Sequence, residues 1–371
     1  MFRSLFPLLM LLLMSAIHGL AYRRILRRLH LGKRARTLLA LGLGANYLGT
    51  LLYIGGRYLF DLPGGLYFFA SLSVAVAFLL LFAILLYEIL HILQTRLPLH
   101  PQRRRLLKRS TDLLFVGAGA LYLGIGLFNG ETRPTVTRVR VDQGVLQRPV
   151  RIAQISDLHI GGLVDRDFVR RIVEIINREQ VDLVAITGDL IDTSVGKNLP
   201  AIEELFRLRS RWGTFYVPGN HEYFHGIEEI LAYLKASPIH VLDNRSRKLG
   251  AFYVVGLTDR MGTRMGRYPP DPEGAFADVP AGAPVLLLMH QPRMLSLLGD
   301  RKPRPSLILA GHTHGGQIWP FGYLVKRIQP YLQGLHLLGP RSAIYVNRGV
   351  GYWGPPMRIG APAEITILEW R

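Results

Sequence analysis

The residues best suited to chemistry form five short polar clusters between residues 157 and 314, each after an apolar run of β type. The clusters are Asp157-Leu158-His159, Gly188-Asp189, Gly219-Asn220-His221-Glu222, His290 and Gly311-His312-Thr313-His314. Each cluster alone indicates little, because an isolated Asp or His after a strand is usually part of a turn. Together they predict one shared site that contains carboxylates, an amide and several imidazoles.

These side chains are typical of a metal site. Imidazole and carboxylate ligands without thiolate favour Mn, Fe, Zn or similar ions over a structural zinc. Two divalent ions bring four positive charges, and Asp157 and Asp189 return only two negative ones, so the site suits a phosphate. Two ions about 3.5–4 Å apart can clamp both oxygens of an in-line displacement and lower the pKa of bound water to about 7. No serine nucleophile is then needed, and Ser156 is interpreted as structural.

The elements that must position these clusters alternate between strands and helices. The apolar runs that precede the clusters are Arg151–Ile155, Asp182–Thr187, Thr214–Val217, Val285–Met289 and Ser306–Ala310. Phe168–Arg178 and Ile227–Leu234 have the apolar spacing of helices. Alternating strands and helices indicate α/β layers, and active groups in such folds gather at the carboxyl ends of strands.

The ordered clusters resemble those of the calcineurin-like metallophosphoesterase family, over about residues 151 to 360. Gly315-Gly316-Gln317, Tyr223 and the stretch Val346–Gly351 further resemble its membrane-associated phosphodiesterase branch, typified by YkuE and YaeI. The resemblance implies an α/β fold: a four-layer α/β/β/α sandwich with the metals at one sheet edge. It also implies two divalent ions as cofactors, with Mn favoured over Fe or Zn.

The resemblance assigns a role to each matching residue. It implies that Asp157, His159, Asp189 and His314 bind one metal, and that Asp189, Asn220, His290 and His312 bind the other, with Asp189 bridging. His221 would contact the scissile phosphate and protonate the leaving oxygen, a role that suits a positioned imidazole. Glu222 would orient His221.

Other polar residues are weighed against structural roles. Asp192 is interpreted as a turn or helix-capping residue in preference to an extra ligand. Arg348 and Arg358 are candidates for contact with a substrate phosphate, because Arg binds phosphate through two hydrogen bonds, although a structural role is favoured. The aromatic stretch Ile318–Tyr331 fits a lid or membrane-facing lip as well as it fits core packing.

The first part of the chain is apolar and has a different organisation. Four apolar stretches lie near Leu5–Tyr22, Thr37–Gly56, Leu66–Ile92 and Leu113–Phe128. Because a spanning helix needs about 20 apolar residues, they predict a transmembrane region of about four helices over residues 1–130. A linker and lead-in strand would occupy residues 131–150, and the catalytic domain residues 151–371. Dense basic charge after the first stretch indicates an uncleaved helix and not a cleaved signal.

The net charge of +19 is concentrated in loops between the apolar stretches, so it is interpreted as a topology signal and nucleic-acid binding is disfavoured. The basic loops after the first and third stretches would face the cytoplasm, which places the catalytic domain outside the cytoplasm at the cell membrane. Glu88 and His91 are interpreted as an interfacial pair. The chain has no cysteine, which excludes disulfides and thiolate metal sites.

We therefore expect a metal-dependent hydrolase of phosphoester bonds, more narrowly of phosphodiesters, that uses a hydroxide bridging two metals. The anchor favours a membrane-proximal or lipid-linked substrate. One alternative is hydrolysis of the pyrophosphate in UDP-2,3-diacylglucosamine during lipid A synthesis, which requires a cytoplasmic domain. Another is a non-catalytic membrane protein with a metal-stabilised domain. The sequence leaves the substrate, the native metals and the oligomeric state open.

Overall fold

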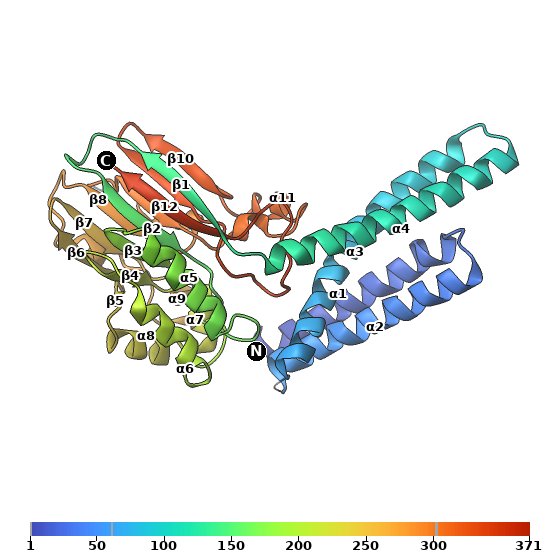
Figure 1. The fold of residues 1–371 in the computed structure, drawn as a ribbon, viewed down its shortest axis with the longest axis horizontal. Helices are drawn as coiled ribbons and strands as arrows, with labels where there is room; N and C mark the ends of the chain where they lie inside the picture. The colour runs from blue at the N-terminus through green and yellow to red at the C-terminus, as the bar shows by residue number, and fades with distance from the viewer. Residues whose placement is uncertain (1, 61, 301–302) are drawn as a thin grey trace. The chain divides into compact units, whose positions relative to one another are not determined.

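The computed structural model describes residues 2–60, 62–300 and 303–371, which fall into two compact units (Figure 1). The helical unit comprises Met1–Glu131 with Gly354–Met357. The sandwich unit comprises Thr132–Trp353 with Arg358–Arg371. Among the described residues, every strand belongs to the sandwich unit.

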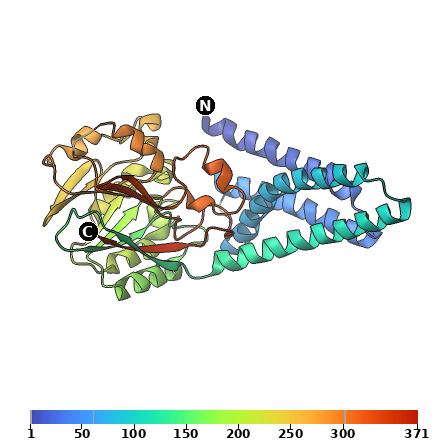
Figure 2. The same cartoon turned by 90° about the horizontal axis from the view of Figure 1, so that it is seen from above.

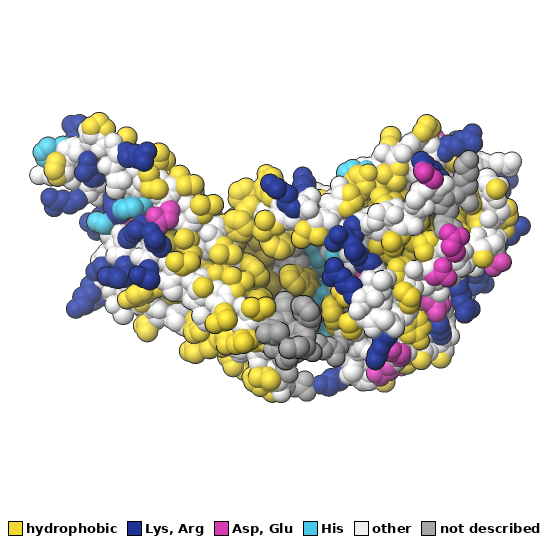
Figure 3. All heavy atoms as spheres, turned by 180° about the vertical axis from the view of Figure 1, so that it is seen from behind, with side chains coloured by type: hydrophobic (Ala, Val, Ile, Leu, Met, Phe, Trp, Pro, Cys, Tyr) yellow, Lys and Arg dark blue, Asp and Glu magenta, His cyan; other side chains and the backbone are white. Residues whose placement is uncertain are grey.

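The helical unit is built from long apolar helices. They are α1 (Phe2–Arg24), α2 (Lys33–Tyr58), α3 (Gly64–Arg96) and α4 (Pro101–Glu131), with a 3-10 turn η1 (Leu26–Arg28) after the first. Each contains a segment long and apolar enough to cross a membrane, in agreement with the four predicted stretches. Helices α1, α2 and α3 pack side by side (Figure 2). Apolar side chains cover much of the unit, and Lys and Arg gather towards one end of it (Figure 3).

A polar network connects the first three helices. Nε2 of His18 lies 2.8 Å from Oδ1 of Asn46. Nδ2 of Asn46 donates to the carbonyl oxygen of Ser73 at 3.1 Å. Nδ1 of His18 lies 2.7 Å from the carbonyl oxygen of Met14. Polar groups within an apolar bundle need such partners because lipid supplies none.

Charged side chains of the helical unit pair across helices. Arg28 donates to both carboxylate oxygens of Glu88, at 2.9 and 3.0 Å. Nζ of Lys108 lies 3.2 Å from Nδ1 of His91. Glu88 and His91, predicted as an interfacial pair, thus each have a basic partner from another element.

Two six-stranded mixed sheets form the centre of the sandwich unit (Figures 1 and 2). The first has the order β1 (Thr135–Val141), β12 (Glu364–Trp370), β2 (Val150–Ile155), β3 (Leu183–Thr187), β4 (Thr214–Val217), β5 (His240–Val241). The second has the order β10 (Gly334–Gly339), β11 (Ser342–Val346), β9 (Leu307–Ala310), β8 (Val285–Leu288), β7 (Phe252–Gly256), β6 (Arg245–Leu249). Strands β2, β3 and β4 are parallel neighbours, as are β7, β8 and β9. Their carboxyl ends therefore share an edge in each sheet.

Apolar clusters join the layers of the sandwich. The inner faces of the two sheets meet in a core that includes Phe215, Leu286 and Trp370. Helices α5 (Arg166–Arg178), α6 (Val195–Glu204) and α8 (Ile227–Lys235) pack with the outer face of the first sheet. Helix α10 (Pro272–Phe276) and the 3-10 helix η3 (Pro292–Leu297) pack with that of the second. This arrangement confirms the predicted four-layer α/β/β/α sandwich.

Helix α5 shows how local sequence builds a layer. Asp165 caps its first turn by accepting a hydrogen bond from the N–H of Phe168 at 2.8 Å. Val169, Ile172 and Ile176 recur at three- and four-residue spacing and are buried. Both predicted helical segments of this half are observed, the first in α5 and the second in α8.

Short elements complete the unit around the ends of the strands. They are η2 (Leu205–Arg207), α7 (Asn220–His225), α9 (Met261–Met265), η4 (His314–Gly316) and α11 (Gly322–Val325). Helix α7 and turn η4 begin at residues predicted as metal ligands. These elements therefore carry site residues directly.

Candidate metal centre

All five polar clusters follow strands that were predicted to end at one site. Asp157 and His159 follow β2, Asp189 follows β3, Asn220 follows β4, His290 follows β8, and His312 and His314 follow β9. The parallel pairing of β2 to β4 and of β8 to β9 aligns these ends within each sheet. The contacts below show that the clusters of both sheets meet.

One group of candidate ligands combines Asp157, His159 and His314. Nε2 of His314 lies 3.4 Å from Oδ1 of Asp157 and 3.1 Å from Nε2 of His159. All three residues are buried. Their nitrogen and oxygen atoms are therefore directed at one small volume, as a shared cation requires.

A second group combines Asp189, His290 and His312. Nε2 of His290 lies 3.1 Å from Oδ2 of Asp189 and 3.2 Å from Nδ1 of His312. The same Oδ2 of Asp189 lies 4.0 Å from Nε2 of His159, which belongs to the first group. Asp189 thus lies between the two groups, where a carboxylate shared by two cations would have to be.

Two buried atoms at the site have no hydrogen-bond partner, namely Oδ1 of Asn220 and Nδ1 of His314. An unsatisfied buried acceptor costs about 1–3 kcal/mol. A divalent cation would satisfy the amide oxygen of Asn220, because carbonyl oxygens are common ligands of hard cations. The residues present therefore fit a cation at the second group.

Burial and neighbouring charges hold most of the candidate ligands in the protonation state that binds metal. Burial, followed by repulsion from His290, lowers the pKa of His312 to about 3. Burial also holds the pKa of His314 well below its ordinary value. Burial alone would raise the pKa of Asp189, but the imidazoles of His290 and His221 outweigh it and hold that pKa well below the usual range. Unprotonated imidazoles and an ionised carboxylate are the forms that bind metal.

His290 differs from the other imidazoles. Although burial favours its neutral form, the adjacent Asp189 raises the pKa of His290 well above its ordinary value. Nδ1 of His290 lies 2.7 Å from the carbonyl oxygen of Thr187, so Nε2 is the atom that faces Asp189. A cation that binds at this nitrogen must displace a proton.

The loops of the site have unusual backbone conformations. Asp157, His159, Asp189, His312 and His314 all have positive φ, between 49° and 72°. The left-handed conformation costs a non-glycine residue about 1–2 kcal/mol. Such strain persists where the surroundings enforce it, and it collects at functional sites.

Glycines next to the ligands allow close backbone approach. A Cβ atom on Gly219 would lie 2.2 Å from Oδ1 of Asp189. A Cβ atom on Gly311 would lie 2.5 Å from Oδ2 of Asp157. The glycines before Asn220 and His312 in the sequence clusters thus make room for the two carboxylates.

Asp192 connects two imidazoles of the site, so the turn or capping role expected from the sequence is wrong. Oδ1 of Asp192 accepts hydrogen bonds from Nδ1 of His159 at 2.7 Å and from Nδ1 of His221 at 2.6 Å. Helix α6 begins after Ser194. The shared carboxylate fixes the orientation of both rings, a common function of residues behind metal ligands. Nε2 of His221 is left 3.9 Å from Oδ2 of Asp189.

Glu222 has a different role from the one that the sequence implied. Its carboxylate accepts hydrogen bonds from the backbone N–H groups of Gly219 at 2.8 Å and Leu190 at 2.5 Å. It therefore ties the loop after β3 to the loop after β4. The carboxylate that orients His221 is that of Asp192, and Glu222 supports the backbone around Asp189.

The two candidate arginines have structural partners. Arg358 is fully buried and donates to the carbonyl oxygens of Arg348, Gly349 and Gly351. Burial lowers the pKa of its guanidinium to about 10. Arg348 forms an ion pair with Glu364 at 2.6 Å. Both contacts agree with the structural role favoured from the sequence.

Asp259 is a buried carboxylate that sequence reasoning missed. It follows β7, and its Oδ1 accepts a hydrogen bond from Nε2 of Gln291 at 2.9 Å, next to His290 in the chain. Its Oδ2 has no partner, and burial raises its pKa to about 6. Its position after an apolar run, like that of the other clusters, was the signal that could have found it.

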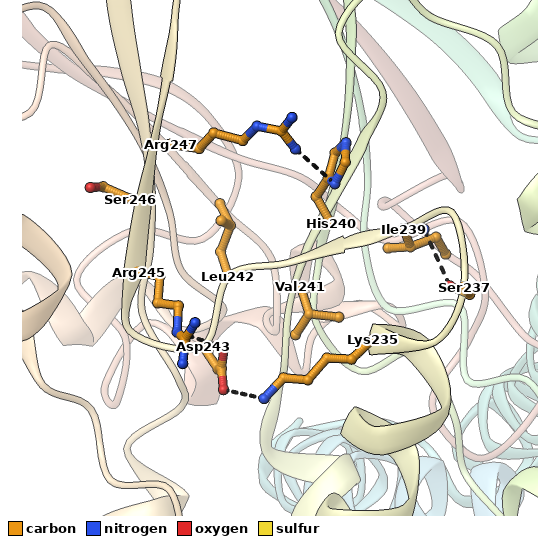
Figure 4. Close-up of a pocket in the computed structure, with 10 residues that line it drawn as sticks. All are labelled: Lys235, Ser237, Ile239, His240, Val241, Leu242, Asp243, Arg245, Ser246 and Arg247. Atoms are coloured by element: carbon orange, nitrogen blue, oxygen red, sulfur yellow. Dashed lines mark hydrogen bonds and ion pairs between the residues drawn. The ribbon is translucent and has the colours of Figure 1, made fainter.

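A surface pocket of about 440 Å³ lies apart from these ligands, at strands β5 and β6 (Figure 4). None of the candidate ligands lines it. Nζ of Lys235 lies 2.6 Å from Oδ2 of Asp243, and Nη1 of Arg247 donates to Nδ1 of His240 at 2.8 Å. Its charged groups pair with one another, so we assign it no function and use His240 as a control position.

Known proteins resemble all or part of this chain. The family described as calcineurin-like phosphoesterase matches residues 150–316. An uncharacterized metallophosphoesterase of Helicobacter pylori is 40% identical over 267 residues, 72% of each chain. The uncharacterized metallophosphoesterase Cj0846 of Campylobacter jejuni is 31% identical over 369 residues, 98% of each chain.

Two further relatives are a protein named as transmembrane and YkuE, which typifies the branch that the sequence resembles. A transmembrane protein with metallophosphoesterase domain of Danio rerio is 32% identical over 273 residues, 70% of this chain and 62% of that protein. The uncharacterized metallophosphoesterase YkuE of Bacillus subtilis is 30% identical over 230 residues, 59% of this chain and 78% of YkuE. The resemblance to YkuE stated from the sequence is thus confirmed.

Proposed function

Because the chain belongs to the calcineurin-like metallophosphoesterase family, whose members are hydrolases, we propose that its sandwich unit cleaves phosphodiester bonds in membrane-proximal or lipid-linked substrates. The observation that carries this proposal is the position of Asp189 between two groups of candidate ligands. In a single buried site, that arrangement provides for a pair of cations and leaves the centre positive enough to attract a phosphate.

Two divalent cations would be held around Asp189. Asp157, His159 and His314 would complete one set of ligands, and Asn220, His290 and His312 the other. Oxygen and imidazole donors suit Mn, Fe and Zn, and we propose Mn as the preferred ion. When bound, the cations would supply Lewis acidity and lower the pKa of water to about 7, so that hydroxide is available at neutral pH.

His221 is the proposed general acid. Its Nδ1 donates to Asp192, so the ring is held with Nε2 directed towards Asp189. The negative charge of Asp192 stabilises the protonated imidazole. As the P–O bond breaks, Nε2 would donate its proton to the leaving oxygen, which departs as an alcohol. Asp192 thus positions the group that moves the proton.

The helical unit makes the chain a membrane protein, and we propose that residues 1–130 form a multi-pass anchor in the cell membrane. Residues 131–150 would link it to a catalytic domain over residues 151–371, outside the cytoplasm. The basic loops of the anchor support this orientation. In sealed right-side-out vesicles, added protease should digest the sandwich unit. Protection of the sandwich unit would instead place it in the cytoplasm, as hydrolysis of UDP-2,3-diacylglucosamine requires.

The activity is tested with full-length protein in detergent. After chelation, added Mn²⁺ should restore hydrolysis of an aryl phosphodiester faster than that of the matching monoester. His221→Ala should abolish turnover, whereas the control His240→Ala, in the pocket of Figure 4, should retain it. Activity that is indifferent both to chelation and to His221→Ala would refute the proposal. Bound metal without turnover on any phosphoester would support a non-catalytic, metal-stabilised domain.

A further inference from the structure

A short segment beside the metal centre exposes large apolar side chains. We name Trp319, Tyr323, Leu324 and Ile328 the apolar rim; their exposed fractions lie between 52 and 64%. The rim begins five residues after His314 and includes part of α11. Core packing, which the sequence allowed for this stretch, therefore does not account for these four side chains. Clustered exposed apolar residues of this kind mark interaction sites.

The rim is firmly attached to the loop that carries the ligands. A Cβ atom on Gly316 would lie 2.4 Å from Cα of Gly322, so the backbones of η4 and α11 are in direct contact. The N–H of Trp319 donates to the carbonyl oxygen of Ile359 at 3.0 Å. Oγ1 of Thr313, between the two ligand imidazoles, donates to the carbonyl oxygen of Leu332 at 2.6 Å. Whatever the rim contacts is therefore held close to the metal centre.

The inner side of the same segment is anchored by a buried amide. Gln329 is almost fully buried, and its Oε1 accepts a hydrogen bond from the N–H of Arg293 at 3.0 Å. Its Nε2 lies 3.4 Å from Oε1 of Gln291, the residue after His290. The segment is thus a fixed ridge with a polar base and an apolar outer face.

The charged residues in the sequence around the rim have one sign. Residues 303–363 contain no Asp or Glu, whereas Lys326 and Arg327 lie within the rim segment itself. Tryptophan and tyrosine favour the boundary between lipid headgroups and acyl chains. Basic residues at a membrane surface add about 1 kcal/mol each through anionic lipids. Apolar, aromatic and basic side chains together match a membrane surface better than they match a water-facing loop.

A bilayer is also within reach of this unit by covalent geometry alone. Helix α4, which is long and apolar enough to span a membrane, ends at Glu131, and β1 begins at Thr135. The three residues between them extend over about 10 Å at most. The sandwich unit is therefore tethered by a short connection to a helix that can span a bilayer.

We propose that the apolar rim inserts into the headgroup region of the bilayer and presents the metal centre to phosphodiesters of lipid headgroups. The insertion is a property of the surface alone. The choice of lipid headgroups as substrates rests on the proposed function. An anionic bilayer is the preferred surface because Lys326 and Arg327 flank the apolar side chains.

The absence of cysteine makes the test direct, because every introduced cysteine is unique. Leu324→Cys and Ile328→Cys would be spin-labelled in the full-length protein and reconstituted into liposomes of anionic and zwitterionic lipid. Glu174→Cys on α5 serves as a water-exposed control, and Leu85→Cys on α3 as a lipid-exposed reference. Electron paramagnetic resonance then compares collisions of each label with oxygen and with a water-soluble nickel complex.

The labels at positions 324 and 328 should collide with the nickel complex several-fold less often than the label at position 174. Their collision rate with oxygen should rise towards that of the lipid-exposed label at position 85. The effect should be larger in anionic liposomes. Nickel accessibility equal to that at 174 would overturn the proposal, as would dipolar broadening showing that the rim contacts a second copy of the chain. Hydrolysis of a soluble aryl phosphodiester, measured on the unlabelled protein, reports separately on the proposed function.

Discussion

The two units of the chain differ in how completely their buried polar side chains are satisfied. In the helical unit, His18, Asn46 and Ser73 bond to one another, and Tyr87 donates to the buried Asp112 at 2.8 Å. In the sandwich unit, buried polar atoms without partners include Oδ1 of Asn220, Nδ1 of His314 and Oδ2 of Asp259, all at or near one end of the sheets. Among the described residues, no such unpartnered atom lies in the four long helices.

The difference is informative where the unpartnered atoms belong to candidate ligands, namely Oδ1 of Asn220 and Nδ1 of His314. A buried network in which every polar group has a partner rigidifies a fold and needs no ligand to complete its hydrogen bonds. An unsatisfied buried group costs about 1–3 kcal/mol, and strained backbone at Asp157, Asp189 and their neighbours adds to that cost. A fold can maintain such a site when a ligand returns the lost interactions. The two kinds of network should therefore respond differently to the same kind of substitution.

The largest effect is expected at the carboxylate between the two ligand groups. Asp189→Asn removes the charge that both cations would share, so Mn-dependent hydrolysis should fall by more than about 100-fold, since even outer-shell partners of metal ligands are worth 10–100-fold. Turnover measured at saturating Mn²⁺ checks this. Activity within threefold (about 0.7 kcal/mol) of the parent would contradict the assignment of Asp189.

A smaller loss of turnover is expected from substitution of Asp192, which hydrogen-bonds to two imidazoles of the site. Asp192→Asn keeps the shape of the side chain but removes the charge that orients His159 and His221. Turnover should fall by about 10–100-fold, and Mn²⁺ affinity should weaken as well. Kinetics together with a metal titration separate the two effects. If only thermal stability changed, Asp192 would have a merely structural role.

Metal binding should become stronger as pH rises. In the metal-free site, Asp189 raises the pKa of His290. At a pH below that pKa, a cation must displace the proton of His290 in order to bind. At a pH above it, the proton is already lost. The apparent affinity should therefore increase by up to about tenfold per pH unit while His290 is protonated. Calorimetric titration of the chelated protein in buffers of different ionisation enthalpy measures the released proton. Affinity that is independent of pH would contradict this account of His290.

The smallest effect is expected in the helical unit. Asn46→Ala removes one partner of His18 and should destabilise the protein by about 1 kcal/mol. Hydrolysis by the folded protein should stay unchanged, because this network belongs to the anchor. Thermal unfolding in detergent and the aryl phosphodiester assay check the two halves of this statement. A loss of turnover without a loss of stability would show that the two networks are not separate in function.

The sequence predicted the meeting of the ligands because strand ends are aligned by pairing, and pairing follows from apolar runs such as Val285–Leu288. It did not predict the partners of Asp192 and Glu222. Asp192 lies in the loop after β3, in which Asp189 has left-handed backbone, and Glu222 lies in the short helix α7. The directions of their side chains therefore do not follow the regular alternation of a strand. Spacing alone made Glu222 the neighbour of His221, whereas the fold directs its carboxylate to backbone N–H groups.

In the helical unit too, the sequence predicted the elements but not the contacts between their side chains. Apolar length predicted four helices, because spanning a bilayer requires it. The pairing of Glu88 with Arg28 depends on which helices are adjacent and on how each is rotated. Apolar composition on all sides of a helix carries little information on either point.

The central claim is that Asp189 joins two cations in one site, and magnetic resonance of the Mn²⁺-loaded protein tests it most directly. The account predicts two Mn²⁺ per chain with the spectrum of a magnetically coupled pair, and loss of the coupling in Asp189→Asn. A single bound Mn²⁺, or two ions that show no coupling in the parent protein, would contradict it.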